Sequence, residues 1–312
     1  MFKNKNIDFI KTSKVVMIVY ASILAVGIIL FAIFGVGLDI NFAGGTRFTY
    51  TYSGDVSVEE ATNIVESKLS GKKVEISTSE GLTTDSKKLV VTLASSEAVD
   101  AKIQADILKG LQEKFKDNKI ELGDSNSVNP TVAGSFFAKS LFAVGIASVL
   151  VLIYVGFRFK KIGGFSAGLT ALIALILDSL IAFITCVIFR LDIDTNFMAV
   201  ILTILGYSLN DTIVIYDRIR ENDRLMPTAS LADKVNTSIN QCLGRSIMTS
   251  VSTFIAILTV VVVSEFFGLS TLRSFAIPMA VGVVSGCIST IFVAVPIWYK
   301  WKSAPKKAKA KK

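Results

Sequence analysis

The sequence predicts a polytopic α-helical membrane protein with six transmembrane helices and a small extracytoplasmic α/β domain between the first two spans. Two observations lead to this prediction. First, 52% of the residues are apolar, and they fall in long blocks instead of being scattered along the chain. A block of about 20 apolar residues is long enough to cross a bilayer of roughly 30 Å. Second, one polar stretch, residues 38–135, separates the first block from the others.

The first apolar run covers residues 15–37 and follows a polar tail, residues 1–14, that is rich in lysine. A cleaved signal peptide is the alternative interpretation. The apolar core of a signal peptide is only about 7–15 residues long and ends at a small-residue cleavage site. The run in this chain is longer, so we predict a retained first span with a cytoplasmic tail before it.

Residues 38–135 form the polar insert, in which strand and helix patterns alternate. Alternating polar and apolar residues are typical of a half-buried strand, whereas apolar residues three and four apart indicate an amphipathic helix. Ser57, followed by Glu59 and Glu60, has the features of a helix N-cap and first turn. The predicted elements are a strand at 46–52, a helix at 57–69, strands at 73–78 and 87–93 joined by a turn at 80–85, a helix at 98–115 and a strand at 119–122. This βαββαβ order is that of a ferredoxin-like domain.

Five more apolar runs complete the predicted set of spans. They cover residues 136–157, 165–189, 195–216, 247–267 and 272–299. A polar link, residues 218–245, precedes the fifth span. Within it, Pro227 breaks the chain and Ser230 is placed to cap a short surface helix leading into that span. The spans and this link make up residues 136–299, and a basic tail, residues 300–312, follows them.

Basic residues cluster at the chain ends and in two links between spans. The net charge is +8, yet residues 38–135 contain more acidic than basic side chains. Lys and Arg mark cytoplasmic loops, so both termini and the links at 158–161 and 218–245 are predicted to be cytoplasmic, and the insert outside. Trp298 and Trp301 are then expected at the inner boundary, where amphipathic rings settle. This pattern indicates contact with anionic lipid and no nucleic-acid-binding surface.

The residues available for chemistry are restricted. The chain has no histidine, and its three cysteines, Cys186, Cys242 and Cys287, lie in or beside apolar runs. Their spacing matches no metal motif and implies no disulfide framework. No phosphate-binding loop of the G-x-x-x-x-G-K-[ST] type is present. We therefore expect no metal, no cofactor and no enzymatic activity, and any proton chemistry must use carboxylates, Lys, Tyr or Cys.

Three ionisable residues fall within or at the ends of predicted spans, namely Asp178, Asp211 and Arg245. An ionised side chain at the centre of a span costs roughly 2.5–3.5 kcal/mol on insertion scales, and such residues usually have a function. Asp211 shares a helical face with other polar residues, and a polar stripe faces the bundle interior or a water-filled path. The supporting polar residues are Thr203, Tyr207 and Asn210 near Asp211, and Thr249 one turn after Arg245.

Each of the three residues also has a purely structural interpretation. Arg245 could extend its charged group to the membrane surface, and Asp211 could be only its static partner. Asp178 is flanked by Ala174 and Ala182, and a hydrogen bond between closely packed helices explains it as well as a proton relay does. We predict that Asp211 and Arg245 titrate or bind an ion, with Asp178 as the third member of the relay.

The stretch from Gly206 to Asn222, Gly-Tyr-Ser-Leu-Asn-Asp-Thr-Ile-Val-Ile-Tyr-Asp-Arg-Ile-Arg-Glu-Asn, resembles the signature of the SecD/SecF family. This family belongs to the resistance-nodulation-division superfamily. The match is nearly unbroken and includes Gly206, Asp217 and Arg218. The order of spans, outside domain and basic tail also resembles that of the family over the whole chain.

Further matches and two departures complete the resemblance. Arg245 is similar to the family's intramembrane Arg, and Asp178 matches an acidic position in the third span. Gly44 and Gly45 match a glycine pair after the first span. Before this pair the family commonly has Asp-Phe, where this chain has Asn-Phe with an Asp two residues earlier. Before the second span the family often has Val-Gly-Pro, where this chain has Val-Asn-Pro, with Asn129 replacing the glycine.

The resemblance implies an accessory subunit of the Sec protein-export machinery in the bacterial cytoplasmic membrane. Such a protein uses the proton motive force, or sodium in some relatives, to move an outside domain that handles the emerging chain. The implied partners are a SecD-like subunit, a SecYEG-type translocation channel, unfolded secretory polypeptides and the lipid bilayer. One elementary charge moved through 100 mV yields roughly 2.3 kcal/mol, which is sufficient for such movements.

Three other functions remain to be weighed. A small-molecule or lipid exporter of the same superfamily usually has two six-span halves in one chain and larger outside domains. An intramembrane aspartyl protease needs two carboxylates that share a proton, but its Gly-x-Gly-Asp motif is absent around Asp211. A purely structural membrane subunit would tolerate the loss of Asp211.

The predicted topology can be tested by labelling. Cysteines introduced at Ser79 and at Ser230 should differ in reaction with a membrane-impermeant thiol reagent applied to intact cells, because only residues 38–135 are predicted to be outside. Ser79→Cys should be labelled before lysis and Ser230→Cys only after it. Labelling of Ser230→Cys in intact cells would contradict the predicted orientation.

Overall fold

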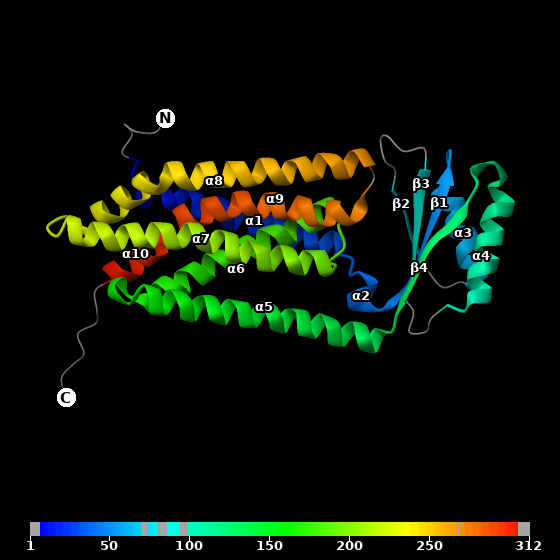
Figure 1. The fold of residues 1–312 in the computed structure, drawn as a ribbon, viewed down its shortest axis with the longest axis horizontal. Helices are drawn as coiled ribbons and strands as arrows, with labels where there is room; N and C mark the ends of the chain where they lie inside the picture. Colours follow the sequence, from blue (N-terminus) through cyan, green and yellow to red (C-terminus); the bar gives the residue numbers. More distant parts are fainter. Residues whose placement is uncertain (1–6, 70–73, 80–85, 94–98, 268, 305–312) are drawn as a thin grey trace.

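The computed structural model describes residues 7–304 apart from residues 70–73, 80–85, 94–98 and 268. The molecule is elongated, with a bundle of long helices that carries a small sheet domain at one end (Figure 1). The bundle contains α1 (Phe9–Phe34), α5 (Pro130–Arg158), α6 (Gly164–Phe189), α7 (Thr195–Leu225), α8 (Leu231–Phe267) and a last span made of α9 (Ser270–Ser289), the π-helical turn η3 (Thr290–Ala294) and α10 (Val295–Ser303). Among the described residues, six helical segments are long and apolar enough to span a membrane, as predicted.

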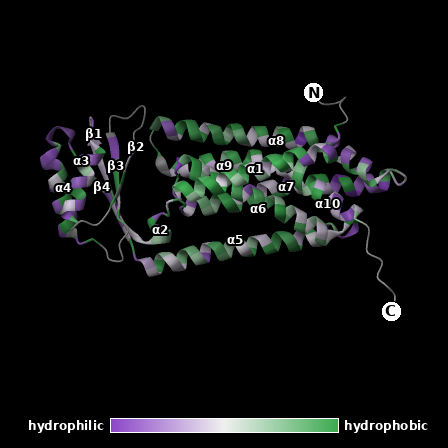
Figure 2. Ribbon diagram, turned by 180° about the vertical axis from the view of Figure 1, so that it is seen from behind, coloured by the Kyte–Doolittle hydropathy of each residue, from purple (hydrophilic) through white to green (hydrophobic). Residues whose placement is uncertain are grey.

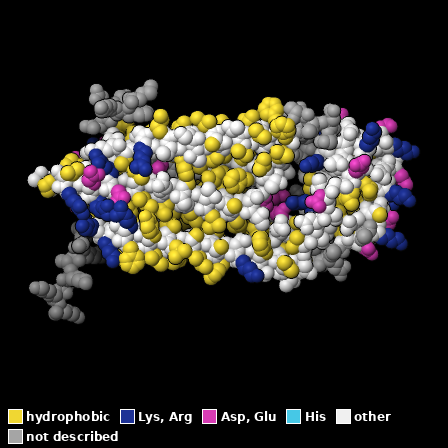
Figure 3. Space-filling view, viewed as in Figure 1, with side chains coloured by type: hydrophobic (Ala, Val, Ile, Leu, Met, Phe, Trp, Pro, Cys, Tyr) yellow, Lys and Arg dark blue, Asp and Glu magenta, His cyan; other side chains and the backbone are white. Residues whose placement is uncertain are grey.

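The six spans differ in how much of their surface the chain itself covers. Many side chains of α6, α7 and the last span are buried, whereas α1, α5 and α8 expose numerous Ile, Val, Leu and Phe side chains. On the face seen in Figure 3, exposed apolar side chains form a broad band over the bundle, and charged side chains gather toward its two ends. Figure 2 shows hydrophobic residues along the middle of the bundle helices, and hydrophilic residues on the sheet domain and at the opposite end of the bundle. Such an apolar band is the surface that a bilayer core covers.

Helices α7 and α8 extend well beyond their apolar runs. Most of the predicted link at 218–245 is helical, and the chain leaves the helices only between Leu225 and Leu231. Charged side chains support the extension, because Lys234 of α8 forms an ion pair with Asp223 of α7 at 2.8 Å. The predicted cap at Ser230 is confirmed, since its Oγ accepts a hydrogen bond from the backbone N–H of Asp233. The surface helix and the fifth span are therefore one continuous helix.

The domain predicted to lie outside the membrane, which we call the outer domain, is a four-stranded antiparallel sheet with two helices on one face (Figure 1). Its strands are β1 (Gly45–Ser53), β2 (Glu75–Ser79), β3 (Ser86–Leu93) and β4 (Glu121–Val128), in the order β2-β3-β1-β4. Its helices are α3 (Val58–Lys68) and α4 (Ala101–Lys114). This arrangement confirms the predicted ferredoxin-like domain. Its core is built from Phe48, Tyr50, Val91, Ile107 and Leu111, all fully buried.

The predicted elements match with one clear difference. Strand β4 continues to Val128, whereas the sequence predicted a strand only at 119–122. It is an edge strand whose side chains are exposed, so its residues carry no apolar alternation, and pairing with β1 alone determines its length. The predicted turn at 80–85 lies outside the described residues.

A short segment joins the sheet to the bundle. The four-residue helix α2 (Ile40–Ala43) follows α1, and Asp39 caps it by accepting a hydrogen bond from the backbone N–H of Asn41. The next two residues need glycine. Gly44 has a φ of +80°, and a side-chain carbon there would collide with Pro130; Gly45 has a φ of +137°, and a side-chain carbon there would collide with the Leu93 carbonyl. The predicted importance of this glycine pair therefore has a backbone explanation.

The outer domain has its own core, so residues 45–128 should fold without the spans. We expect a two-state unfolding transition in urea with a mixed α/β circular dichroism spectrum. In this fragment Ile107→Ala should lower the free energy of unfolding by about 2–5 kcal/mol. The exposed Lys109→Ala on the same helix should change it by less than about 0.5 kcal/mol. A fragment without a cooperative transition would show that the domain depends on contacts with the bundle or with another chain.

Candidate functional site

The first predicted site residue, Asp211, is buried in the bundle without a hydrogen-bond partner. Its side chain lies on α7 and is 5% exposed. Its Oδ2 atom is buried and makes no hydrogen bond, and no Lys or Arg among the described residues forms an ion pair with it. Arg245 of α8 is near enough to act on it electrostatically. The structure therefore brings Asp211 and Arg245 together as neighbours, but in an unpaired arrangement.

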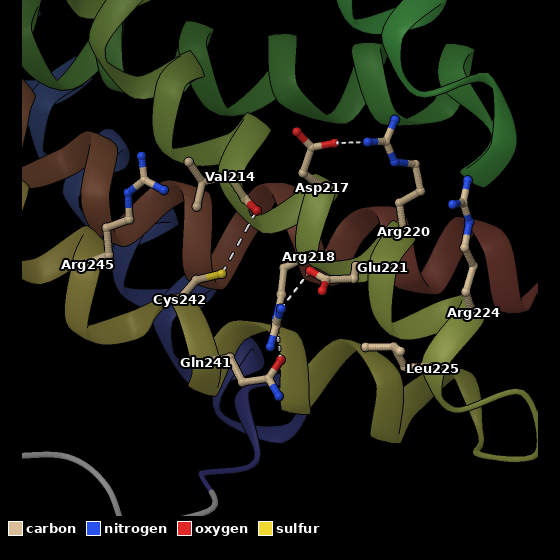
Figure 4. Close-up of a pocket in the computed structure, with 10 residues that line it drawn as sticks. All are labelled: Val214, Asp217, Arg218, Arg220, Glu221, Arg224, Leu225, Gln241, Cys242 and Arg245. Atoms are coloured by element: carbon tan, nitrogen blue, oxygen red, sulfur yellow. Dashed lines mark hydrogen bonds and ion pairs between the residues drawn. The ribbon is translucent and has the colours of Figure 1, made fainter.

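Arg245 lies at one end of a cavity of about 730 Å³ between α7 and α8 (Figure 4). These parts of α7 and α8 lie toward the end of the bundle away from the sheet (Figure 1). Arg224 lies at the other end of the cavity in Figure 4. Val214, one turn after Asp211, also lines it. The cavity thus extends from the charged ends of the helices to within about one helical turn of Asp211.

Ion pairs surround this cavity and connect three helices. Asp217 of α7 pairs with Arg158 of α5 at 2.9 Å and with Arg220 at 2.8 Å. Arg218 pairs with Glu221 at 2.6 Å, and its Nε donates to Gln241 Oε1 of α8 at 2.6 Å. The motif residues Asp217 and Arg218 therefore belong to two separate sets of contacts: Asp217 joins α7 to α5, and Arg218 joins α7 to α8.

The motif also ends on a structural residue that sequence reasoning missed. Asn222 is 2% exposed, and its Nδ2 donates to Ser238 Oγ and to Gln241 Oε1 of α8, both at 2.8 Å. A buried amide that makes two hydrogen bonds fixes the distance between the two helices. The only available signal was its place at the end of the motif.

The predicted supporting polar residues divide into two groups. Tyr207 lies between the helices, and its hydroxyl donates to Ser250 Oγ of α8 at 3.3 Å. The others face outward from the bundle. Exposed polar or small residues on this surface, which we call the α7–α8 face, are Thr203, Gly206 and Asn210 of α7 with Arg245 and Thr249 of α8. Nothing lies within 4 Å of the position that a Gly206 side chain would take.

Asp178 occupies a separate place in the bundle. It lies on α6, is completely buried, and accepts hydrogen bonds from Ser208 of α7 and from Ser285 and Ser289 of α9. The hydrogen bonds that its carboxylate accepts come from these serines and not from Arg245. Sequence reasoning missed these serines, although Ser285 and Ser289 are four residues apart and so share one helical face.

The described residues contain no cluster of His, Cys, Asp or Glu that could hold a metal ion. The three cysteines are buried and unpaired. Each of them packs between helices as a small apolar side chain would.

The fold and the site define a class of protein: a multi-pass membrane protein with an inserted ferredoxin-like domain and an intramembrane carboxylate next to an arginine. Residues 107–304 match the family model described as protein export membrane protein SecD/SecF, C-terminal. The chain therefore belongs to the SecD/SecF family, as its sequence signature predicted.

Individual relatives agree with this assignment. The chain is 31% identical to protein translocase subunit SecF of Alicyclobacillus acidocaldarius, with 95% of this chain and 93% of the relative covered. It is 34% identical to the SecF subunit of Sebaldella termitidis, with 99% and 94% covered. Among solved structures, SecDF of Thermus thermophilus, described as a translocon-associated membrane protein, matches with a TM-score of 0.82 and 29% identity. That match covers 96% of this chain but only 39% of the SecDF chain.

Proposed function

We propose that this protein is an accessory subunit of the Sec protein-export machinery in the bacterial cytoplasmic membrane. It uses a transmembrane gradient of protons, or of sodium ions, to drive movements that assist the translocation and release of preproteins on the outer side. The names of its full-length relatives support the role in export. The observation that supports ion coupling is the buried, unpaired carboxylate of Asp211 beside Arg245.

Ion coupling requires two states of this pair. When Arg245 contacts Asp211, the carboxylate is stable as an anion, because the opposite charge compensates it. When the two part in apolar surroundings, the carboxylate is stable as a neutral acid that has taken up a proton. The unpaired arrangement corresponds to the second state. The cavity lined by Arg245 would bring water from one end of the bundle to within about one helical turn of Asp211.

A chain of contacts connects α7 to the outer domain. The loop before α7 pairs with the segment after α1, because the N–H of Asp39 donates to the Ile193 carbonyl at 3.1 Å and the N–H of Ile193 donates to the Gly37 carbonyl at 2.8 Å. Asp39, which is 4% exposed, forms an ion pair with Arg47 of β1 at 2.6 Å. A displacement of α7 would therefore be transmitted through this loop to the first strand of the sheet.

The α7–α8 face supports the proposed partner, a SecD-like subunit. Lipid cannot satisfy the exposed amide of Asn210 or the charge of Arg245 at membrane depth, so a protein or water must cover them. The open space at Gly206 permits the close approach of another helix. A relative named SecDF, from Bacillus subtilis, is matched over only 38% of its length, which leaves a large part of that chain to supply the covering surface.

Other parts of the proposal rest on the family alone. A SecYEG-type channel and unfolded secretory polypeptides are the proposed further partners, and the sheet domain is the part proposed to handle the emerging chain. A small-molecule or lipid exporter half-unit is the alternative. The relatives named as translocase subunits over nearly the full chain favour the export role.

The partner's docking face can be tested with a bulky substitution. Gly206→Trp should leave the isolated chain folded, because the position is open, yet it should strongly reduce recovery of the SecD-like subunit with the tagged protein from gently solubilised membranes. Gly145→Trp is the matched control on α5, where the same space is also empty. Loss of the partner with Gly145→Trp but not with Gly206→Trp would place the interface on α5 instead.

The coupling role of Asp211 can be tested with Asp211→Asn, which keeps the size and much of the hydrogen bonding but cannot titrate. This variant should assemble with its partner, yet an imposed proton gradient should no longer accelerate export of a secretory precursor into membrane vesicles. Arg245→Met should also lose the acceleration. The control variant Asp223→Asn, at an exposed position further along α7, should keep the acceleration of export by the proton gradient.

Two outcomes of this experiment decide the proposal. Export by Asp211→Asn vesicles at the wild-type rate under the proton gradient would show that Asp211 is structural and that the coupling mechanism is wrong. Repeating the measurement with a sodium gradient identifies the ion, because only the coupled ion should accelerate export by the unmodified protein.

A further inference from the structure

Asp178 lies at the centre of a buried cluster of hydroxyl groups drawn from several helices. Its Oδ2 atom accepts hydrogen bonds from Ser208 Oγ and Ser289 Oγ, both at 2.8 Å, and its Oδ1 atom accepts one from Ser285 Oγ at 2.6 Å. On the far side of Ser285, the Tyr20 hydroxyl of α1 donates to the Ser285 carbonyl at 3.0 Å and lies 3.2 Å from Ser285 Oγ. All five side chains are buried.

The cluster contains no cation to compensate an ionised Asp178. No Lys or Arg among the described residues forms an ion pair with this carboxylate. The titratable groups that face the cluster are Tyr20 from α1 and Cys287 from α9, and α7 contributes Ser208, which does not titrate. A buried carboxylate without a counter-charge is costly, even when it is well hydrogen-bonded. A proton would remove that cost.

The hydroxyl groups can satisfy both forms of the carboxylate. In the ionised form, Ser285 donates to Oδ1 and Tyr20 donates to the Ser285 carbonyl. When a proton binds Oδ1, that O–H donates to Ser285 Oγ, and the Ser285 hydrogen turns toward the Tyr20 oxygen, while Tyr20 continues to donate to the carbonyl. Ser208 and Ser289 donate to Oδ2 throughout. Asp178 can therefore bind and release the proton while the oxygen atoms of Asp178, Ser285 and Tyr20 all keep a hydrogen-bond partner.

We propose that Asp178, Ser285 and Tyr20 form a second proton-binding site in the membrane spans, distinct from the Asp211–Arg245 pair. One proton adds to Oδ1 of Asp178 on binding, and the same proton returns to water on release. The occupant is a proton, because the three serine oxygens already touch the carboxylate oxygens. A metal ion could reach the carboxylate only by displacing them.

The site is placed to act on α7. Ser208, one of the three donors to Asp178, lies on α7 one turn before Thr212, and its backbone carbonyl accepts from Thr290 Oγ1 at 3.4 Å. Thr290 begins the π-helical turn η3, and such turns are frequent at functional sites. Proton binding at Asp178 changes the strength of the α6–α7 contact next to Asp211. The proposal that Asp178 binds a proton does not depend on the proposed function, whereas a role for this proton in coupling rests on that function.

Infrared difference spectroscopy of the full chain in lipid vesicles tests the site. In an Asp211→Asn background, lowering the pH should produce a carboxylic acid C=O band that belongs to Asp178, identified as the component of the difference spectrum that is lost when Asp178→Asn is added. Tyr20→Phe keeps the ring but removes the oxygen that accepts the turned Ser285 hydrogen. It should retain the band while weakening proton binding by about tenfold, a downward shift of roughly one pH unit in the midpoint.

Each outcome is decisive for the site. If no band depends on Asp178, or if that band does not change with pH, the carboxyl group has one fixed form and the proposal is wrong. If Tyr20→Phe leaves the midpoint of the titration unchanged, the proposed hydroxyl arrangement is wrong. Tyr20→Phe provides this test even if Asp178→Asn fails to fold. The two proposals can fail separately. If the Asp178 band is present but Asp211→Asn vesicles export at the wild-type rate, the proton site is retained and the coupling mechanism is rejected. If the band is missing but Asp211→Asn loses the acceleration of export, the proton site is rejected and the coupling mechanism is retained.

Discussion

The structure depends on how an apolar bundle accommodates two carboxylates. An ionised side chain away from water must be paired, hydrogen-bonded or neutralised, because the bilayer offers it no other partner. Asp178 has three serine donors and no cation, so its surroundings are complete within this chain. Asp211 has a buried oxygen without a donor and an arginine close by. Asp178 is thus fully hydrogen-bonded but lacks a counter-charge, whereas Asp211 lacks a hydrogen-bond donor but has an arginine beside it.

This contrast explains why the polar groups of α7 lie on two sides. Ser208 and Thr212 point into the bundle, where they meet Asp178 and Thr290. Thr203 and Asn210 lie on the opposite, exposed side. A helix that carried polar groups only for packing within its own chain would have no reason to leave an amide exposed at membrane depth. One side of α7 thus packs within this chain, and the other is the side on which we propose that a partner docks.

Much of the fold could be predicted from the sequence, because periodicity and length report burial directly. The six spans and the order of the outer domain follow from apolar runs and from alternation. Strand β4 could not be predicted in full, because an exposed edge strand has no apolar pattern. Trp298 was expected at the inner boundary; the structure adds that it is 1% exposed and packs against Tyr216, in the helix that follows the π-helical turn η3. Periodicity alone contains no signal for such a turn.

The site was predictable only in part, for a related reason. An ionisable residue in an apolar run is conspicuous, and so Asp178, Asp211 and Arg245 could be singled out. Their partners were not conspicuous, since serine is common in spans and its role depends on which helix faces it. The neighbourhood of Asp211 and Arg245 could be expected from their positions near one end of consecutive spans. That Asp211 and Arg245 form no ion pair could not be predicted, because it depends on the conformations of the two side chains.

The contacts at its two ends restrict how α7 can move. At one end, Asp217 and Asn222 hold it to α5 and α8. At the other, Asp194 caps it, and the adjoining loop is hydrogen-bonded to the segment that leads into the sheet. Between these ends its inner side is joined to α6 through Ser208, and its outer side is open at Gly206. A change at Asp211 or Asp178 would therefore be expressed as a shift of the middle of α7 against α6 or toward the partner. The paired loop would carry that shift to the outer domain.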